Sequence, residues 1–277
     1  MTGTHFCCPL CGGALTVCGN ALRCAQGHSF DIASQGYVHL LPVQKMRTKI
    51  PGDSREMIAA RQRFLNAGFY APFREGIASL VCRAVRDIPS PLVVDAGCGE
   101  GYYTAGILSV LISRGHTPAV CGFDISKWAV IAAAKRHCGA EFAVAGSFAI
   151  PLPDASADVL TAVFSPIAEA EFARVVRPGG MLLLAVAGQR HLYGLKQVLY
   201  EHPYENEHKK TDYPGFVFLS RTPIRGEITL TDKQQISDLF SMTPYYWKTP
   251  ADGAKRLAEL TELTTEIGFD LVCYKRV

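Results

Sequence analysis

A chain of 277 residues, of which 48% are hydrophobic and 19% charged, can bury a full core and is long enough for one large domain or two. This composition excludes a disordered chain, and the longest uncharged apolar run, Met181 to Ala187, is too short to cross a bilayer. The net charge of +3 permits a nucleic-acid partner without requiring one. Because Met1 to Leu10 shows no basic segment followed by an apolar stretch, we predict a cytoplasmic protein with no membrane partner.

The first 30 residues form a cysteine-rich segment that holds five of the ten cysteines in the chain. In a cytosolic protein, clustered cysteines indicate metal ligands more often than disulfides. The spacing is Cys-x2-Cys, then twelve residues, then Cys-x3-His, and glycines after the second cysteine let the turn close around a tetrahedral zinc ion. We therefore predict four zinc ligands, which are Cys8, Cys11, Cys24 and His28. Buried free thiols are the alternative, and Cys7 and Cys18 are spare under the zinc interpretation.

Residues 1–42 are predicted to form a small zinc-binding domain. Residues 14–23, between the two knuckles, can form one hairpin. Residues 37–41 run from alternating to apolar and are expected to form a strand that closes the small domain, with Pro42 ending it.

Residues 43–66 are predicted to form a basic linker and first helix. Asp53 or Ser54 is expected to cap a helix that runs to Asn66 before Gly68. The positive charges of this segment are on Lys45, Arg47, Lys49, Arg55, Arg61 and Arg63. The segment is either a solvated linker or a connector that lies on phosphates. A second amphipathic helix is expected over residues 71–85.

A glycine-rich loop follows the first strand of the larger domain, residues 67–277. The apolar run Leu92 to Val94 ends at Asp95 and leads into Gly97, Gly99 and Gly101, ahead of a helix-like run over residues 102–113. Glycines at a strand end let the backbone pass close to a nucleotide-like ligand. The spacing differs from the Gly-x-Gly-x-x-Gly of dinucleotide folds. It resembles the first motif of class I S-adenosylmethionine-dependent methyltransferases.

The remaining chain up to residue 186 alternates strands and helices, which predicts an α/β fold with a parallel sheet and helices on both faces. The expected strands are residues 92–94, 119–124, 141–145, 158–164 and 181–186. Asp124 ends the second strand, where a carboxylate can accept both ribose hydroxyls of a cofactor, or it caps the helix over residues 126–137. The phrase from Ala173 to Gly180, with a turn at Arg177 to Gly180, resembles class I methyltransferases and indicates their Rossmann-like fold.

The chain resembles the RlmA (RrmA) family of bacterial 23S ribosomal RNA guanine-N1 methyltransferases over nearly its whole length, from residue 8 to about 247. The matching segments are Cys8-Pro-Leu-Cys11, Cys24-x3-His28-x-Phe30-Asp31, Gly36 to Pro42, Pro51 to Ser54, Val94 to Thr104, Leu152-Pro153, Ser165-Pro166, Arg190-His191-Leu192 and Met242-Thr243-Pro244. The chain departs from the family pattern at Gly188-Gln189-Arg190 and over residues 201–225.

This resemblance implies methyl transfer from S-adenosylmethionine to N1 of one guanine in a stem-loop of 23S rRNA, with the zinc domain recognising that RNA. Whether the enzyme forms a homodimer is left open. The residues expected to bind the cofactor are Tyr70, Asp95, Gly97, Gly99, Glu100, Gly101, Asp124 and His191. Asp95 is expected to support the loop, and Tyr70 and His191 match family positions near the cofactor, although either could serve packing instead.

No firm catalytic residue follows from the sequence. Phe164 could stack on the target base and Ser165 could accept a proton or hydrogen bond, or both could simply end a strand. Tyr245 to Trp247 are candidates to receive an unstacked base, although such a cluster is more often core. Two other functions compete with the rRNA enzyme: a methyltransferase of the same fold acting on a small molecule, and a non-catalytic zinc-containing RNA-binding adaptor.

Overall fold

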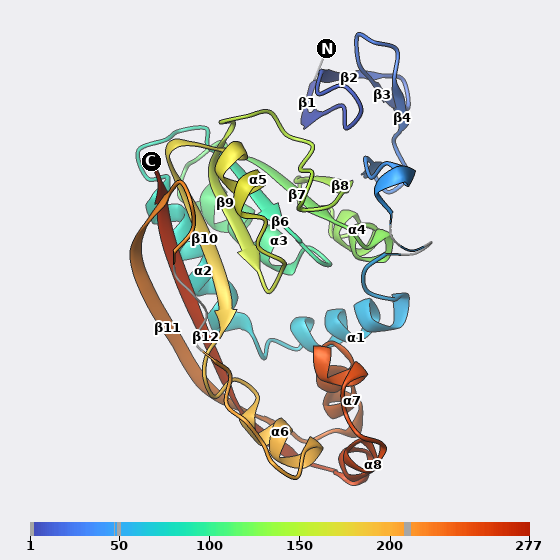
Figure 1. Ribbon diagram of the computed structural model, residues 1–277, viewed down its shortest axis with the longest axis vertical. Coiled ribbons are helices and arrows are strands. Elements are labelled where there is room, and N and C mark those ends of the chain that lie inside the picture. The colour runs from blue at the N-terminus through green and yellow to red at the C-terminus, as the bar shows by residue number, and fades with distance from the viewer. Residues whose placement is uncertain (1–2, 47, 49–50, 208–211) are drawn as a thin grey trace.

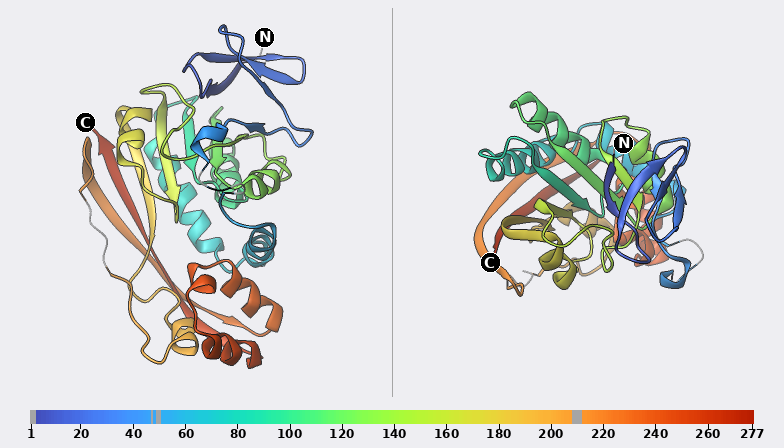
Figure 2. Two further views of the ribbon diagram at one scale, coloured as in Figure 1. Left: turned by 45° about the vertical axis from the view of Figure 1, so that its right-hand side comes forward. Right: turned by 90° about the horizontal axis from the view of Figure 1, so that it is seen from above.

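The computed structural model describes residues 3–46, 48, 51–207 and 212–277, and their strands form two sheets (Figure 1). Strands β1 (Gly3–Cys7), β2 (Ala14–Cys18), β3 (Ala21–Arg23) and β4 (Ser29–Asp31) make an antiparallel sheet in chain order. The predicted hairpin is therefore confirmed as β2 and β3. This small zinc domain lies at one end of the molecule, next to the large domain (Figure 2, left view).

The strand expected to close the zinc domain belongs to the large sheet. Strand β5 (Val38–His39) pairs in parallel with β8 (Glu141–Val144), and the Leu40 amide donates to the Val144 carbonyl at 2.9 Å. The prediction that residues 37–41 close the small domain is thus wrong. The physical reason is burial, because Val38 and Leu40 pack in an apolar cluster that joins the large-sheet strands to the small domain, to which Val38 also bridges at Ile32.

Two helices precede the first predicted strand. Helix α1 (Arg55–Asn66) begins after the short 3-10 helix η1 (Val43–Lys45), and the Ser54 hydroxyl accepts from the Met57 amide, so Ser54 is the cap. Gly68 follows with φ of 87°, and helix α2 (Ala71–Ala84) matches the second predicted helix.

Several positive charges of the basic segment make contacts within the protein. Arg63 makes a bidentate pair with the buried Asp238 at 2.6 and 2.9 Å, and Arg61 pairs with Asp53 at 2.6 Å. Arg55 lies 5.7 Å from the Trp128 ring. Arg47 and Lys49, which belong to the same prediction, lie outside the described residues.

The large sheet has the order β11-β12-β10-β9-β6-β7-β8-β5. Its parallel centre is β6 (Leu92–Ala96), β7 (Ala119–Asp124), β8, β9 (Ala157–Val163) and β10 (Val176–Ala187), with α3 (Tyr102–Ser113), α4 (Lys127–Ala134) and α5 (Glu169–Val175) between them. Val93 packs in the cluster of α2 and α3, whereas Val94 packs in the cluster of α5. Alternate residues of one strand therefore bury opposite faces, and the prediction of helices on both faces is confirmed.

Two details of the predicted sheet differ. The expected turn at Arg177 to Gly180 lies within the irregular start of β10, where the register shifts between Val176 and Met181 and Gly179 has φ of 78°. The sheet is also mixed, because β12 (Leu263–Arg276) joins β10 in antiparallel fashion and β11 (Phe216–Leu230) adds to β12. The five predicted strands are all parallel, as expected, and the two antiparallel strands at this edge were not predicted.

Strands β11 and β12 extend beyond the core as a long ribbon (Figure 1). At its far end lie α6 (Tyr193–Leu199), α7 (Lys233–Ser241), the 3-10 helix η2 (Pro244–Trp247) and α8 (Ala251–Glu259). We call α7, η2 and α8 the cap. The cap turns back onto α1 through the Arg63–Asp238 pair, so that it faces the loops of the sheet. Among the described helices, none has the length and apolar character needed to span a bilayer.

Candidate active site and metal centre

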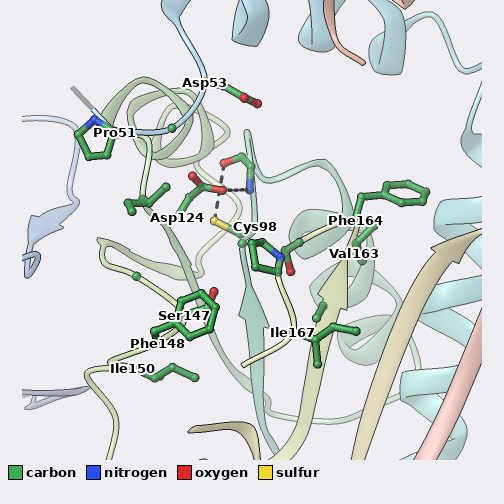
Figure 3. A pocket seen from close by; sticks show the side chains of 18 of the residues that line it. Pro51, Asp53, Cys98, Asp124, Ser147, Phe148, Ile150, Val163, Phe164 and Ile167 are labelled. Atoms are coloured by element: carbon green, nitrogen blue, oxygen red, sulfur yellow. Dashed lines mark hydrogen bonds between the residues drawn. The ribbon is translucent and has the colours of Figure 1, made fainter. Parts of the chain in front are cut away.

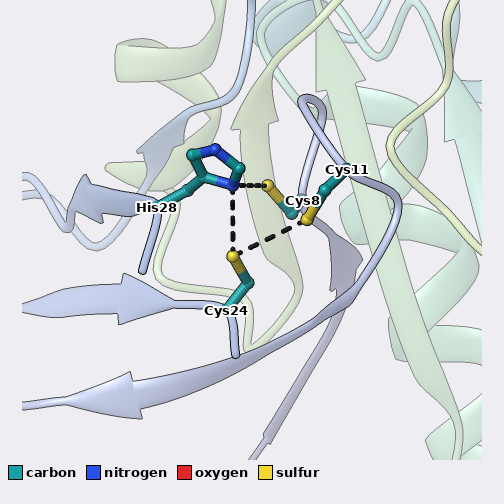
Figure 4. A group of neighbouring side chains, drawn as sticks. All are labelled: Cys8, Cys11, Cys24 and His28. Atoms are coloured by element: carbon teal, nitrogen blue, oxygen red, sulfur yellow. Dashed lines mark hydrogen bonds between the residues drawn. The ribbon is translucent and has the colours of Figure 1, made fainter. Parts of the chain in front are cut away.

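Four donor atoms converge between the two knuckles of the zinc domain (Figure 4). The His28 Nδ1 atom lies 3.5 Å from Cys8 Sγ and 3.3 Å from Cys24 Sγ, and the sulfur atoms of Cys11 and Cys24 are 3.7 Å apart. Tetrahedral zinc with ordinary Zn–S and Zn–N bonds needs ligand atoms about 3.5–3.8 Å apart. The residues predicted as ligands therefore fit a zinc ion. The spare cysteines lie outside this group, with Cys7 buried and Cys18 exposed.

The zinc domain is joined to the large sheet by direct bonds. The Cys7 amide donates to the Pro151 carbonyl at 2.9 Å, and His5 Nδ1 lies 2.6 Å from a carboxylate oxygen of Glu141 on β8. Thr4 donates to the same carboxylate. The hydrogen bond and the charge of Glu141 raise the pKa of His5. The metal-binding segment is thus held beside the loop over residues 146–154.

The glycine loop is held against the next strand by its backbone. The amides of Gly97 and Cys98 both donate to the Phe123 carbonyl, at 2.9 and 3.0 Å. A Cβ atom on Gly97 would lie 2.4 Å from Ser165 Cβ, so close packing requires glycine there. At Gly99 an added Cβ would meet no atom within 4 Å, because this residue faces open space. Such a loop leaves backbone exposed to a ligand above the strand ends.

The two predicted aspartates have different surroundings. Asp95 is buried beneath the loop and accepts from Thr104 at 2.5 Å and Thr161 at 2.9 Å, and burial raises its pKa to about 6. It does not line the cavity, which agrees with a supporting role. Asp124 does line the cavity and accepts from the amides of Gly99 at 3.0 Å and Ser126 at 2.8 Å. Ser126, not Asp124, caps α4 with its hydroxyl. Asp124 thus lines the cavity at the end of β7, and its binding to ribose stays a prediction.

Glu100 carries an unsatisfied polar atom. Its Oε2 atom pairs with the Arg136 guanidinium, whose Nε lies 2.8 Å away, whereas Oε1 is buried with no partner among the described residues. Glu100 lines the cavity, and burial raises its pKa. Because a buried carboxylate oxygen without a donor is costly, this atom indicates a site for a donor group of a ligand.

An aromatic group surrounds the end of β9. Phe164 has a positive φ of 53° and a half-exposed ring, which lies 6.2 Å from the His191 ring at an interplanar angle of 11°. Burial lowers the pKa of His191 to about 3, and its Nδ1 accepts from the Gly268 amide at 3.3 Å, so the neutral ring carries its proton on Nε2. Tyr70 is buried edge-on against Phe269 at 4.9 Å. Tyr70 and His191 both pack against neighbouring rings and line the cavity, and their contact with the cofactor stays a prediction.

Ser165 is already engaged, because its hydroxyl donates to the Ala96 carbonyl at 2.7 Å. It can therefore accept a hydrogen bond but does not have a free proton to offer.

Most of the residues predicted to bind the cofactor, together with Phe164 and Ser165, border one cavity of about 2880 Å³ (Figure 3). Its walls are residues 7–10 and 12 of the zinc domain, the glycine loop, residues 146–154, residues 162–167, and residues 242–245, 247 and 248 at the cap. Trp247 is 71% exposed and Tyr245 half-buried, and both line the cavity. The core interpretation of this aromatic cluster is therefore wrong for Trp247. Gly101 stands apart, because it does not line the cavity, and a Cβ atom added there would lie 3.0 Å from Ala133 Cβ.

Several wall residues were not predicted. Asp53 was considered only as a helix cap, Arg61 only as one charge in a basic run, and Tyr204 lies in the segment where the chain departs from its family pattern. The exposed Phe148 directs its ring into the cavity from the loop after β8 (Figure 3). A Gly-Asp-Ser cap followed by an arginine-rich helix was the available signal for the first two.

Comparison with known proteins gives matches over both domains. Residues 6–49 match the family described as RlmA, N-terminal, a zinc ribbon, and residues 93–180 match a methyltransferase domain. The chain is 37% identical to a putative 23S rRNA (guanine-N1)-methyltransferase of Micromonospora griseorubida, over 94% of this chain and 93% of that protein. It is 34% identical to the 23S rRNA (guanine(748)-N1)-methyltransferase of Streptomyces fradiae, over 95% and 94%. A putative enzyme of the same description from Bacillus subtilis is 30% identical, over 96% and 95%.

Proposed function

The chain belongs to the family of 23S rRNA (guanine-N1)-methyltransferases, and we propose that it methylates N1 of a guanine within a stem-loop of 23S rRNA. The observation that carries this proposal is the shared cavity, in which the glycine loop, the zinc domain and the cap form one space of about 2880 Å³. Pockets for small ligands are typically about 300–1,000 Å³. The volume therefore supports a cofactor together with part of a large acceptor.

The cofactor residues of this proposal lie on the loop side. S-adenosylmethionine supplies the methyl group. Asp124 accepts from ribose hydroxyls, the Gly97–Gly99 backbone lies along the ligand, and Glu100 Oε1 accepts from the ammonium group of the methionine part. Tyr70 and His191 close the apolar side of the site, while Asp95 holds the strand end through its threonine bonds.

The acceptor residues lie at the end of β9 and on the cap. A guanine must leave its stack to reach the cavity, and exposed aromatic rings stabilise an unstacked base. Phe164 and Trp247 offer such rings, and the Ser165 oxygen can accept from the base edge. Neutral guanine carries a proton on N1, which must leave as the nitrogen is methylated. No side chain is assigned as its acceptor, because alignment of the base alone can supply much of the rate.

The zinc domain contributes structure and position in this proposal. A bound zinc ion fixes the two knuckles, and the bonds from Cys7 to Pro151 and from His5 to Glu141 hold them at the cavity. RNA recognition by residues 1–42 and action in the cytoplasm, where ribosomes are assembled, are parts of the same proposal.

A homodimer also belongs to the proposal. Strand β11 is an edge of the large sheet and exposes Val217, Phe218 and Leu219. An open edge with apolar side chains favours pairing with another chain. Sedimentation equilibrium of the purified protein is expected to give twice the monomer mass, and a monomer at all concentrations would contradict it.

Tritium transfer from labelled S-adenosylmethionine tests the activity. Label is expected in 23S rRNA, and reverse transcription of rRNA from a strain lacking the gene is expected to lose one stop, because N1-methylguanine blocks base pairing. Label found only in small metabolites would instead support the small-molecule alternative. Absence of both transfer and cofactor binding would favour the non-catalytic adaptor.

A further inference from the structure

Arg61 lies where three parts of the molecule meet at the cavity. Its Nη1 atom is 2.6 Å from Asp53 Oδ2, and its Nη2 atom donates to the Met242 carbonyl of the α7–η2 connection at 3.2 Å. The side chain is 24% exposed and lines the cavity. These contacts engage two of the five N–H groups of a guanidinium, so donors remain for a further partner.

The charge of Arg61 acts on the acids of the loop side. Arg61, Glu100 and Asp124 all line the cavity, and the positive charge of Arg61 opposes the burial that raises the pKa of both acids. Asp53 lies in the same wall. This part of the cavity thus combines three carboxylates with one cation, a pattern that suits a ligand carrying charges of both signs.

The other cations lining the described cavity wall are poor candidates for an anion there. Arg174 directs all five N–H groups to the carbonyls of residues 150 and 152 and to the carboxylates of Glu171 and Asp154. Lys248 is exposed and directly follows Trp247 of the cap. His191 is neutral because burial lowers its pKa to about 3.

We propose that Arg61 binds the carboxylate of the methionine part of S-adenosylmethionine, next to the ammonium group held by Glu100. This inference rests on the proposed cofactor. Ribose on Asp124 leaves the amino-acid end of the ligand to the neighbouring wall, where Glu100 and Arg61 lie. A guanidinium offers paired N–H groups that match the two oxygens of a carboxylate. The buried, unpaired Oε1 of Glu100 supplies the matching acceptor for the ammonium group.

Two ligands that differ by one carboxyl group test the proposal. Calorimetry on the full-length, zinc-loaded protein measures binding of S-adenosylhomocysteine and of its decarboxylated form, S-adenosyl-3-thiopropylamine. Arg61→Ala is expected to weaken binding of the first about 10- to 100-fold, as a lost charge-assisted bond does, and of the second less than about threefold. Arg61→Lys keeps the charge but loses the paired N–H groups, so its affinity for S-adenosylhomocysteine is expected to lie between those of the unaltered protein and Arg61→Ala.

Matched variants separate this effect from neighbouring ones. Arg55→Ala removes a positive charge from the same helix outside the cavity and is expected to change neither affinity. Because Arg61→Ala leaves Asp53 unpaired, the double variant Asp53→Asn with Arg61→Ala is also measured, and the carboxylate-specific loss is expected to persist. Thermal unfolding of each variant reports on folding.

The outcomes distinguish two failures. Equal losses for both ligands in Arg61→Ala, or equal affinities of the unaltered protein for both ligands, would overturn the role of Arg61 while leaving the cofactor in place. If the unaltered protein bound neither ligand, the proposed cofactor would fail, and this inference with it.

Discussion

The two sides of the cavity are built in different ways. On the loop side, the buried Asp95 and the partly buried Asp124 are both hydrogen-bonded, and Gly97 packs closely against Ser165. On the cap side, Trp247 is exposed and is carried by a helix pair at the end of a long ribbon. A packed wall fixes a small ligand to within fractions of an ångström, whereas an exposed aromatic wall can receive bases of a flexible RNA. We therefore expect the methyl donor to bind on the rigid side and the acceptor on the open side.

The largest expected effect comes from overpacking the loop side. Gly97→Ala would force a positive φ on alanine and bring Cβ to 2.4 Å from Ser165 Cβ, at a cost of about 2–5 kcal/mol of unfolding free energy. We expect S-adenosylhomocysteine binding to fall by more than about tenfold, measured by calorimetry. Gly115→Ala is the control, because Gly115 also has a positive φ but meets no atom within 4 Å and lies away from the cavity. A normal cofactor affinity in Gly97→Ala would contradict the rigid wall.

Removal of a zinc ligand is expected to affect the acceptor and spare the donor. We predict one zinc ion per chain, and Cys24→Ser should lower the measured zinc content and reduce rRNA methylation by more than about tenfold, since ligand loss opens the knuckles. Cofactor affinity should stay within about twofold, because the glycine loop is bonded to Phe123 and not to the knuckles. The exposed Cys18, changed to serine, serves as the control. Methylation at the normal rate in Cys24→Ser would exclude a role for the zinc domain.

A change on the cap side is expected to be smaller and confined to RNA. Trp247→Ala removes an exposed ring from the cavity wall, and loss of one stacking partner costs about 1–3 kcal/mol. The KM for rRNA should therefore rise about 5- to 100-fold with an unchanged affinity for S-adenosylhomocysteine. Tyr246→Ala is the control for position, because Tyr246 is the exposed neighbour of Trp247 in the chain but does not line the cavity. Equal defects in both variants would show that Trp247 has no special contact.

The smallest expected effect concerns pH and the bond between zinc domain and sheet. The pKa of His5 is raised and that of Glu141 is lowered. The stabilisation from His5 is complete below its unfolded value near 6.5 and is lost as pH rises through the higher folded value. That from Glu141 is lost as pH falls below about 4.5. Because both groups are partly exposed, we expect less than about 1 kcal/mol. The fall in Tm between pH 6 and 8 should be shallower in His5→Gln. An unchanged slope would show that the His5–Glu141 pair does not contribute to stability.

Local signals in the sequence predict the loop side well. Helix α3 and strand β7 have the predicted bounds, because Asp95, the three glycines and Asp124 mark sharp chain reversals. The positions of the four zinc ligands follow equally from local spacing. Strand β11 could not be found in this way. Pro223 and Gly226 within it argue against a strand, and most of its side chains are exposed, so it lacks the alternation of a half-buried strand. Proline is tolerated there because β11 is an edge.

The ion-pair partners of charged residues also could not be predicted from the sequence. Arg61 and Arg63 are two residues apart and look alike in a basic run, yet one faces the cavity and Asp53 and the other pairs with Asp238 of the cap. That division depends on which face of α1 meets which element, and Asp238 of the cap lies 175 residues from Arg63 in the chain. The same long-range contact decides where Trp247 lies. The loop side of the cavity can therefore be predicted from local sequence signals, whereas the cap side depends on long-range contacts and cannot.

The pairing of β5 with β8 has a consequence for the order of folding during synthesis. Val38 and His39 leave the ribosome roughly a hundred residues before their partners Ala143 and Val144. The knuckles, by contrast, close through contacts between residues 8 and 28 and can bind metal as soon as they emerge. The first domain to fold thus becomes attached to the sheet only after β8 is in place. A nascent chain stopped before residue 141 would carry a formed zinc domain that is still free to move.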